Sequence, residues 1–547
     1  MKSTSSLLSM PLEVLLQITS YLTTEDYGRL RTSCKHIEAS LFKSFAKEFF
    51  SKRQFSITEF SLNALIAISK SRFASSVTYL IIHLERPVRN ALGNPIFPSP
   101  TLTIDRALSQ NIFREHYFRH LELTNTGQDV ELLTEALKNL PKLETVGLRD
   151  FNSGGRYRED TSWHSYGTPT FLADTSAILE RPNLTTTSGL ERDDSKYICH
   201  VFLAILRALG NARDAQPAPS RLEVILRHCY LPDRAFSIPR HLEPKIFPVL
   251  ADLKALFVVV NSTYPDIMVA YTETSAKSYP MFLLSKFLLR TPSLKHLRLN
   301  FDGYNNHAVD SLLRWLSEKP YSSRASTTGA SASILAIDSH IDPSKLPTVP
   351  PPLELCSLEH LEIGTANIEP EVLLNLYRKY KSTLRSISLH KVSLIDLVHE
   401  YQDKINLWAK LCNQMAKLGL GLTNIKFSYV SQQHNGSSHK CPVGFDPTGV
   451  ANPYVKEWTG SDLSHALKDF VDSLTVHWPE DPATDDDDED EDEDEDINED
   501  DDDDDEENDL MGEDEDEDED PMATAPMTLD EVVAIALGTD QNLDLGG

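Results

Sequence analysis

The chain has 547 residues, 40% of them hydrophobic and 25% charged, with a net charge of −31 at pH 7. Of the 83 acidic residues, 30 lie in residues 485–520, and the remaining 53 nearly balance the 52 Lys and Arg. A near-neutral body lacks the excess of cations that nonspecific binding to nucleic acid or to anionic membranes needs, so we expect neither partner. The length allows two to four domains with a sizeable core.

The cysteines and the first residues favour an intracellular location. Six cysteines are spread along the chain with no C-x-x-C pair, which favours free thiols in a reducing compartment. The N-terminus has no long apolar stretch before a small-residue cleavage site, so we expect no signal peptide. No run approaches the ~18 apolar residues of a membrane span. We therefore expect the protein in the cytoplasm, the nucleus or both.

Three short helices are predicted within residues 5–50. Pro11 suits a first helical position, where its missing N–H costs nothing. Thr23 and Asp26 resemble a capping box that begins a second helix, and a third helix carries an apolar residue at every fourth position from Ile37 to Phe49. Three such helices bury too little surface to stand alone, so they need the rest of the chain or a partner. The first helix has apolar residues at helical spacing: Val14, Leu15, Ile18, Tyr21 and Leu22.

The stretch MPLEVLLQITSYLTTEDYGRLRTSCKHI, residues 10–37, resembles an F-box. Met10 and Tyr27 stand where the family usually has leucine, and Ser33 stands where it usually has an apolar residue. The resemblance implies docking on a Skp-type adaptor, which links the family to cullin–RING ubiquitin ligases. The alternative is an ordinary N-terminal helical hairpin. The resemblance assigns adaptor contacts to eight residues: Pro11, Val14, Leu15, Ile18, Leu22, Tyr27, Leu30 and Cys34.

Residues 51–478 alternate amphipathic helices with a recurring motif L-x-x-φ-x-φ, where φ is apolar. The end of the motif alternates with period two, which predicts a short strand with one buried face. Helix and strand in repetition are typical of a leucine-rich-repeat solenoid, and with the F-box the chain resembles a group of fungal F-box proteins. The motifs are 26 to 79 residues apart, so the array is irregular. A non-repetitive α/β domain with parallel strands and crossover helices is the alternative. The motif is clearest in LETVGL (143–148), LKALFV (253–258), LKHLRL (294–299), LEHLEI (358–363) and LRSISL (384–389).

Three long polar segments, 150–194, 319–354 and 431–460, are predicted to be loop insertions. Such loops are either tolerated insertions or binding loops above the repeats. The first segment contains Trp163, Tyr166 and Phe171. Because aromatic side chains anchor interfaces, we take these three as candidate substrate contacts.

The sequence carries no strong catalytic or metal-binding motif. It contains no G-x-x-x-x-G-K-[ST], no H-E-x-x-H and no G-x-S-x-G. His434, His439 and Cys441 are close in sequence, but no fourth ligand has the spacing of a structural zinc site. We therefore expect no metal, no cofactor and a non-catalytic protein. An enzyme hidden in the body is the less favoured interpretation.

Residues 479–520 form the predicted acidic tail. Neighbouring carboxylates about 3.3 Å apart along the chain repel one another within a Debye length of about 8 Å, so we expect disorder. The C-terminal segment, 521–547, contains a predicted short helix over 528–538, with Thr528 as N-cap and Gly538 at its end.

Two functions are consistent with this organisation. The favoured one is the substrate-recognition subunit of an SCF-type cullin–RING ubiquitin ligase, with an unknown protein as target. The alternative is a scaffold or chaperone-like protein outside such a ligase, which uses the acidic tail to bind basic proteins such as histones.

Overall fold

The computed structural model describes most of the body of the chain. The acidic stretch 485–520, the helix predicted over 528–538 and Trp163 all lie outside the described residues. Within them, helices and strands form a mixed α/β fold, as the sequence predicts. The described residues are 7, 10–88, 106–152, 164–182, 191–261, 281–302, 306–319, 350–435, 437, 439–445 and 452–479.

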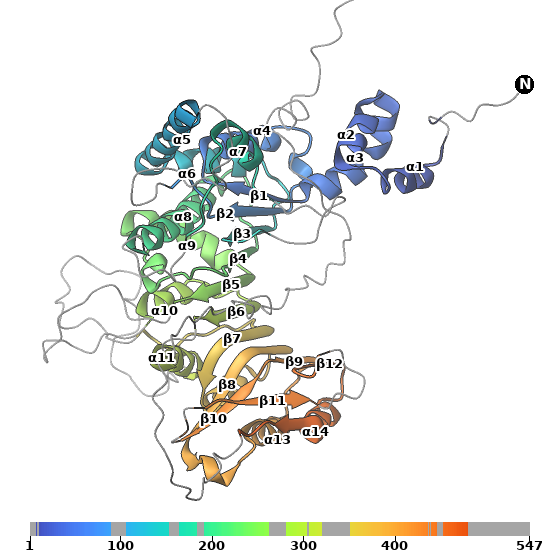
Figure 1. Ribbon diagram of the computed structural model, residues 1–547. Helices are drawn as coiled ribbons and strands as arrows, with labels where there is room; N and C mark the ends of the chain where they lie inside the picture. The colour runs from blue at the N-terminus through green and yellow to red at the C-terminus, as the bar shows by residue number, and fades with distance from the viewer. Residues whose placement is uncertain are drawn as a thin grey trace, which may run out of the picture.

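The N-terminal module consists of the three expected helices, α1 (Leu12–Thr19), α2 (Thr24–Thr32) and α3 (Lys35–Phe50). The side chain of Thr23 accepts a hydrogen bond of 3.1 Å from the backbone N–H of Asp26, which confirms the predicted cap of α2. The ring of Tyr27 packs edge-on against Phe45 and Phe49, with centroids 5.5 and 5.7 Å away. Figure 1 shows this module projecting from the β1 end of the sheet.

The body is built on one sheet whose strands follow each other in chain order. Strands β1 to β8 are neighbours in sequence order and pair in parallel throughout, with β9 and β10 also parallel to β8. The remaining pairs, β12 with β9, β10 with β11 and β11 with β13, are antiparallel. The strands are β1 (Lys52–Ser56), β2 (Tyr79–His83), β3 (Thr145–Arg149), β4 (Arg221–Ile225), β5 (Ala255–Val260), β6 (His296–Phe301), β7 (His360–Ile368), β8 (Ser386–Glu400), β9 (Asn424–Ser428), β10 (Ser431–Asn435), β11 (Cys441–Phe445), β12 (Val455–Thr459) and β13 (Leu474–Val476).

Helices connect the successive strands from β1 to β9. Figure 1 shows α5, α6 and α8 to α11 along one side of the stack. No helix in the described part of the chain is long and apolar enough to cross a membrane. The helices of the body are α4 (Glu59–Ser69), α5 (Arg106–Thr126), α6 (Gln128–Leu137), α7 (Thr168–Thr175), α8 (Glu191–Ala212), α9 (Glu243–Asp252), α10 (Phe282–Leu288), α11 (Asn306–Ser317), α12 (Pro370–Tyr380), α13 (Leu407–Leu418) and α14 (Leu463–Ser473).

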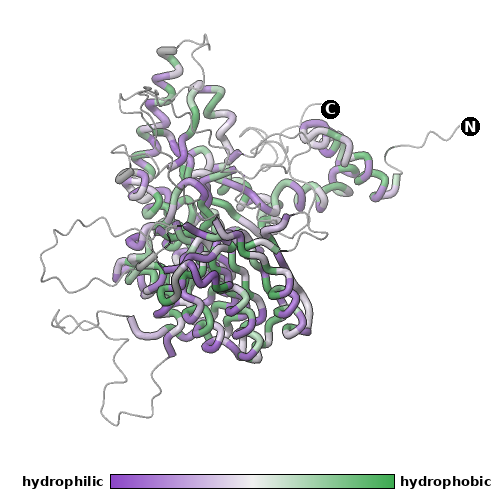
Figure 2. Tube along the Cα trace, turned by 60° about the horizontal axis from the view of Figure 1, so that its bottom comes forward, coloured by the Kyte–Doolittle hydropathy of each residue, from purple (hydrophilic) through white to green (hydrophobic). Residues whose placement is uncertain are grey.

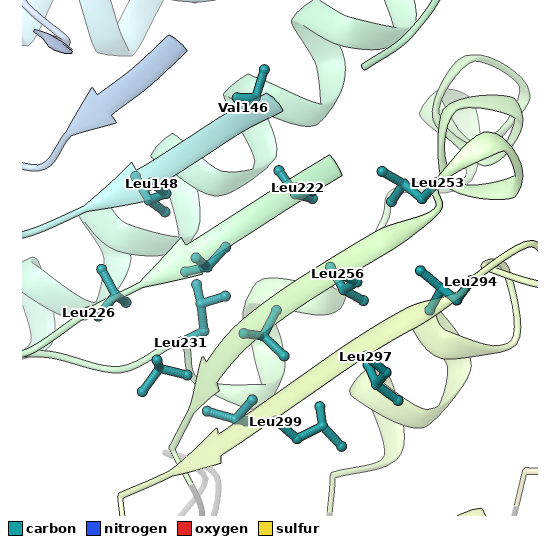
Figure 3. Close-up of a cluster of buried hydrophobic side chains, with 14 of the residues drawn as sticks. Val146, Leu148, Leu222, Leu226, Leu231, Leu253, Leu256, Leu294, Leu297 and Leu299 are labelled. Atoms are coloured by element: carbon teal, nitrogen blue, oxygen red, sulfur yellow. The ribbon is translucent and has the colours of Figure 1, made fainter. Parts of the chain in front are cut away.

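The motif leucines form one face of the sheet, which we call the leucine face. The parallel register aligns Leu222, Leu256, Leu297, Leu361 and Ile387 in one row across β4 to β8. All are buried in a single hydrophobic cluster that also contains the inner residues of the helices. Figure 3 shows Leu222, Leu256 and Leu297 of this row on successive strands. Each strand–helix unit therefore completes its core only against its neighbours.

Two of the three predicted insertions contain regular structure. The segment 150–194 includes α7 and the start of α8, and 431–460 includes β10, β11 and β12. The prediction of plain loops is corrected there, while most of 319–354 lies outside the described residues. The polar sequence of β10 suggested a loop, but its buried polar side chain Gln432 has hydrogen-bond partners within the chain. The amide oxygen of Gln432 accepts a hydrogen bond of 2.9 Å from the N–H of Leu407, and its amide nitrogen donates one of 2.8 Å to the carbonyl of Ile405.

Candidate functional site

One face of α1 exposes apolar side chains to solvent. The side chain of Val14 is 40% exposed and that of Tyr21, just beyond the helix, is 82% exposed. Together with Pro11 and Ile18 they recur at helical spacing on one side of α1, and we call this set the docking stripe. Hydrophobic residues run along this module in Figure 2. Because exposed apolar residues that gather on one side of a helix are typical of protein contacts, the docking stripe is a candidate interaction site.

The eight predicted adaptor contacts divide into surface and core. Leu15 and Tyr27 are buried, so they support the docking stripe from beneath instead of forming it. Ile18, Leu22, Leu30 and Cys34 are half-buried, and Pro11 and Val14 are exposed. Tyr21 is absent from the predicted set although it is the most exposed apolar residue of the module. Adaptor contact through any of these residues stays a prediction.

Aromatic packing fixes the helical module to the body. Only Ser51 separates α3 from β1, and the ring of Phe73 stacks on Phe50 at a centroid distance of 4.1 Å. Arg72 lies 4.7 Å above the ring of Phe42 and forms an ion pair with Glu38 of α3. The docking stripe therefore has a defined orientation relative to the sheet.

The residues that alternate with the motif leucines form the second face, which we call the polar face. In β6, His296, Arg298 and Asn300 are half-buried, whereas the intervening leucines are buried. The parallel register aligns such residues from strand to strand. One row contains Lys52, Tyr79, Thr145, Arg221, Ala255, His296, His360 and Ser386, and the next contains Gln54, Ile81, Gly147, Glu223, Phe257, Arg298, Glu362 and Ser388.

Tyr79 is the centre of the first interaction network on the polar face. Its hydroxyl donates to the carboxylate of Glu223 and accepts from Arg149 Nη2 at 3.0 Å, while Lys52 Nζ lies 4.7 Å from its ring centroid. Burial and the neighbouring Glu223 raise the pKa of Tyr79, against the opposing charge of Arg149, so its hydroxyl stays protonated at neutral pH. A Cβ at Gly147 would lie 3.0 Å from this ring, so glycine lets Tyr79 lie across β3.

Phe257 is the centre of the second network. The guanidinium groups of Arg221 and Arg298 lie 4.8 and 5.9 Å from its ring centroid, and the ring of His296 meets it edge-on at 4.6 Å. These contacts join β4, β5 and β6 through aromatic and cationic groups.

Carboxylates of the polar face pair with its cations. Arg221 Nε lies 2.9 Å from Glu223 Oε1, and Arg298 Nε lies 3.8 Å from Glu362 Oε2. Burial opposes ionisation of Glu362, but the hydrogen bond from His296 and the charge of Arg298 outweigh it and hold its pKa below the usual value. The side chain of Arg221 is 41% exposed and that of Glu223 only 5%, so the cation is the group presented to a partner there.

The predicted substrate contacts Tyr166 and Phe171 are core residues, which corrects that interpretation. Tyr166 is buried and stacks on Phe55 of β1 at 4.9 Å. Phe171 of α7 is buried in a small cluster with Phe113 of α5. The reason is that the segment folds back: the N–H of Tyr166 donates to the carbonyl of Gln54 at the edge of the sheet, 3.2 Å away. Trp163 lies outside the described residues.

His434, His439 and Cys441, which are close in sequence, do not form a ligand set in the structure. His434 is buried in β10 with its Nε2 3.0 Å from Gln432 Nε2, Cys441 is buried in β11, and His439 is exposed between them. Within the described ranges, no three His, Cys, Asp or Glu side chains are grouped so that they could hold a metal ion. All six cysteines are free thiols.

A hollow of about 200 Å³ lies between α4 and α5, lined by Glu59, Phe60, His116, His120 and their neighbours. Nδ1 of His120 lies 2.9 Å from the backbone carbonyl of Ile57. Burial lowers the pKa of His120 to about 4, against the opposing effect of that hydrogen bond. His120 is therefore a neutral imidazole at physiological pH.

Comparison with protein families identifies one domain. The F-box domain family matches residues 7–40, which include α1, α2 and the beginning of α3. No curated protein matches the chain. The protein therefore carries an F-box domain, and the docking stripe lies within it.

Proposed function

We propose that this protein is the substrate-recognition subunit of an SCF-type cullin–RING ubiquitin ligase. The observation that carries the proposal is the F-box match at residues 7–40, on a module whose docking stripe is exposed. F-box domains typically dock on a Skp-type adaptor, and a buried interface with such an adaptor would cover the stripe. The protein itself is a non-catalytic adaptor, which raises the rate of ubiquitin transfer by holding the target close to the ligase.

The body would hold the target as an irregular leucine-rich-repeat-like solenoid. Two observations support this: strands β1 to β8 follow one another in parallel, and their aligned leucines share one continuous core. Such a stack leaves its polar face as an extended surface for a protein partner. The fixed contact of Phe73 with Phe50 would give a bound target a defined orientation toward the ligase.

Co-purification of the full chain tests the proposal. Tagged protein from cells should retain a Skp-type adaptor together with a cullin, whereas a variant with charged substitutions in the docking stripe should lose both. Recovery of histones without a cullin would instead support the scaffold alternative, and retention of the adaptor by the stripe variant would contradict the proposed docking site.

A further inference from the structure

The hollow between α4 and α5 belongs neither to the docking stripe nor to the polar face. Its two helices follow β1 and β2 in the chain. Its volume of about 200 Å³ exceeds the ~150 Å³ in which an engineered apolar cavity holds benzene. It is smaller than the pockets of about 300 Å³ or more that take drug-sized ligands. The hollow therefore has room for one aromatic ring with a small substituent.

Aromatic contacts form the wall of the hollow. The ring of His116 meets that of Phe60 edge-on at a centroid distance of 5.7 Å, and that of Phe171 at 5.3 Å. The ring of Phe60 rests directly on the backbone of Gly167, where an added Cβ would overlap it. Gly167 also has a φ of +87°, which favours glycine. Because these neighbours hold both rings, the wall is already in place before an occupant binds.

His120 supplies one hydrogen-bond acceptor to the hollow. It lines the hollow although it is only 4% exposed. A carbonyl can only accept, so the 2.9 Å contact with Ile57 places a proton on Nδ1 of His120. In the neutral ring the other nitrogen, Nε2, then carries a lone pair, and no residue in the described part of the chain bonds it. Because an enclosed acceptor without a partner costs free energy, the hollow favours an occupant with an O–H or N–H at its tip.

Polar side chains surround the mouth of the hollow. Arg119 and Glu59 approach within 3.5 Å as an ion pair, and their side chains are 52% and 43% exposed. Asn63, one turn after Glu59 on α4, is also exposed. An apolar centre within a polar rim is the usual anatomy of a protein–protein contact, and tyrosine is prominent among the side chains that dominate such contacts. The two charges and the amide suit the donors and acceptors of a peptide backbone on either side of an inserted side chain.

We propose that the hollow between α4 and α5 binds a tyrosine side chain of a protein partner, with its phenol O–H donating to Nε2 of His120. A phenol combines the two properties that the hollow selects, a flat apolar ring and a donor at its far end. The ring of the tyrosine lies against Phe60 and His116. The inference goes beyond the proposed function, because it adds a recognition site, and the residue type that it takes, outside the docking stripe and the polar face.

Binding of p-cresol to the full-length protein tests the chemistry of the hollow by saturation-transfer NMR. p-Cresol is the side chain of tyrosine without its backbone, toluene lacks the hydroxyl, and 4-methylanisole carries a methyl group on the oxygen and cannot donate. p-Cresol should bind at least about fivefold more tightly than either of the others, because only its hydroxyl can donate to the acceptor. Equal affinities of p-cresol and toluene, or no saturation transfer to p-cresol, would overturn the proposal.

Variants of the lining residues locate the binding. Asn63→Trp fills the exposed mouth with a large ring and should weaken p-cresol binding at least tenfold. Its control, Arg114→Trp, alters an exposed residue of α5 about 160° around the helix from His116 and should leave binding unchanged. His120→Phe keeps a ring but removes Nε2, so p-cresol should lose its advantage over toluene. Equal effects of the Asn63 and Arg114 variants, which change exposed residues only, would overturn the proposal even if His120→Phe does not fold.

Labelled peptide pools test whether the occupant belongs to a protein. Three pools of nine-residue peptides have tyrosine, phenylalanine or O-methyltyrosine at the centre and random residues elsewhere. By fluorescence anisotropy, the full-length protein should bind the tyrosine pool at least about fivefold more tightly than the other two, and Asn63→Trp should abolish the difference. Equal binding of the three pools would overturn a tyrosine-bearing partner.

These measurements are independent of the proposed ligase function. None of them involves an adaptor or a cullin, so their failure would leave adaptor docking by the F-box standing. Failure of adaptor docking would equally leave the binding of p-cresol and of the peptide pools unaffected, because the docking stripe lies on α1 and the hollow between α4 and α5.

Discussion

The docking stripe of α1 and the polar face of the sheet are two surfaces with opposite chemistry. The stripe exposes Val14 and Tyr21, whose burial would release water from apolar surface. The polar face engages its charged groups in networks around Tyr79 and Phe257. Apolar burial gives an affinity that salt hardly changes, whereas complementary charge gives selectivity and a salt-dependent rate of encounter. The comparison indicates a lasting partner for the first surface and an exchangeable one for the second.

Charged substitutions in the docking stripe should produce the largest effect. Val14→Asp with Tyr21→Asp should weaken adaptor binding about 100-fold or more, because each buried apolar side chain contributes about 1.5–3 kcal/mol. Isothermal calorimetry with a purified Skp-type adaptor checks this, and the unaltered complex should lose little affinity between low and high salt. Leu12→Asp is the control, since Leu12 is 44% exposed but lies about 160° around the helix from Val14.

Removal of the ring that joins the module to the body should destabilise both. Phe73→Ala should lower the free energy of unfolding by about 3–5 kcal/mol, because the buried ring stacks on Phe50 and Phe42. Denaturant unfolding measures this. Leu397→Ala removes a side chain that is 62% exposed and should change stability by less than about 0.5 kcal/mol. A loss below 1 kcal/mol for Phe73→Ala would contradict a rigid junction.

Acid should destabilise the body through His120. Its pKa is about 4 in the folded protein, against 6.5 ordinarily, so the unfolded chain binds the proton more readily between these values. The contribution of neutral His120 to the free energy of unfolding is therefore fully present above pH 6.5. It is lost as the pH falls toward 4, by up to about 3 kcal/mol. Urea unfolding from pH 7 to pH 4.5 should show a shallower decline for His120→Gln than for the unaltered protein. Equal slopes would show that other groups set the decline.

Deletion of residues 480–547 should have the smallest effect. A chain of closely spaced carboxylates cannot collapse into a core, so we expect the melting temperature to stay unchanged within error. Adaptor binding should also persist, because the docking stripe lies at the other end of the chain. Differential scanning calorimetry checks the first expectation, and a drop of several degrees would show that the segment takes part in the fold.

The sequence alone determined the features that depend on local periodicity. The apolar spacing from Val14 to Leu22 and the cap at Thr23 predicted α1 and α2, because a helix brings together residues three and four positions apart. The alternation in LKHLRL predicted β6 and its buried leucines, because successive side chains of a strand point to opposite faces. Neither inference requires knowledge of distant residues.

Only the tertiary structure decided which polar side chains meet. Tyr79 and Glu223 are separated by 144 positions, and the sequence does not show that β2 and β4 lie on either side of Gly147. The same holds for Tyr166 and Phe171, which read as exposed loop residues until the chain folds back on β1 and α5. The register between strands that are far apart in sequence is fixed when the leucine face is buried as a whole. This burial depends on the packed core and not on any local pattern of the sequence.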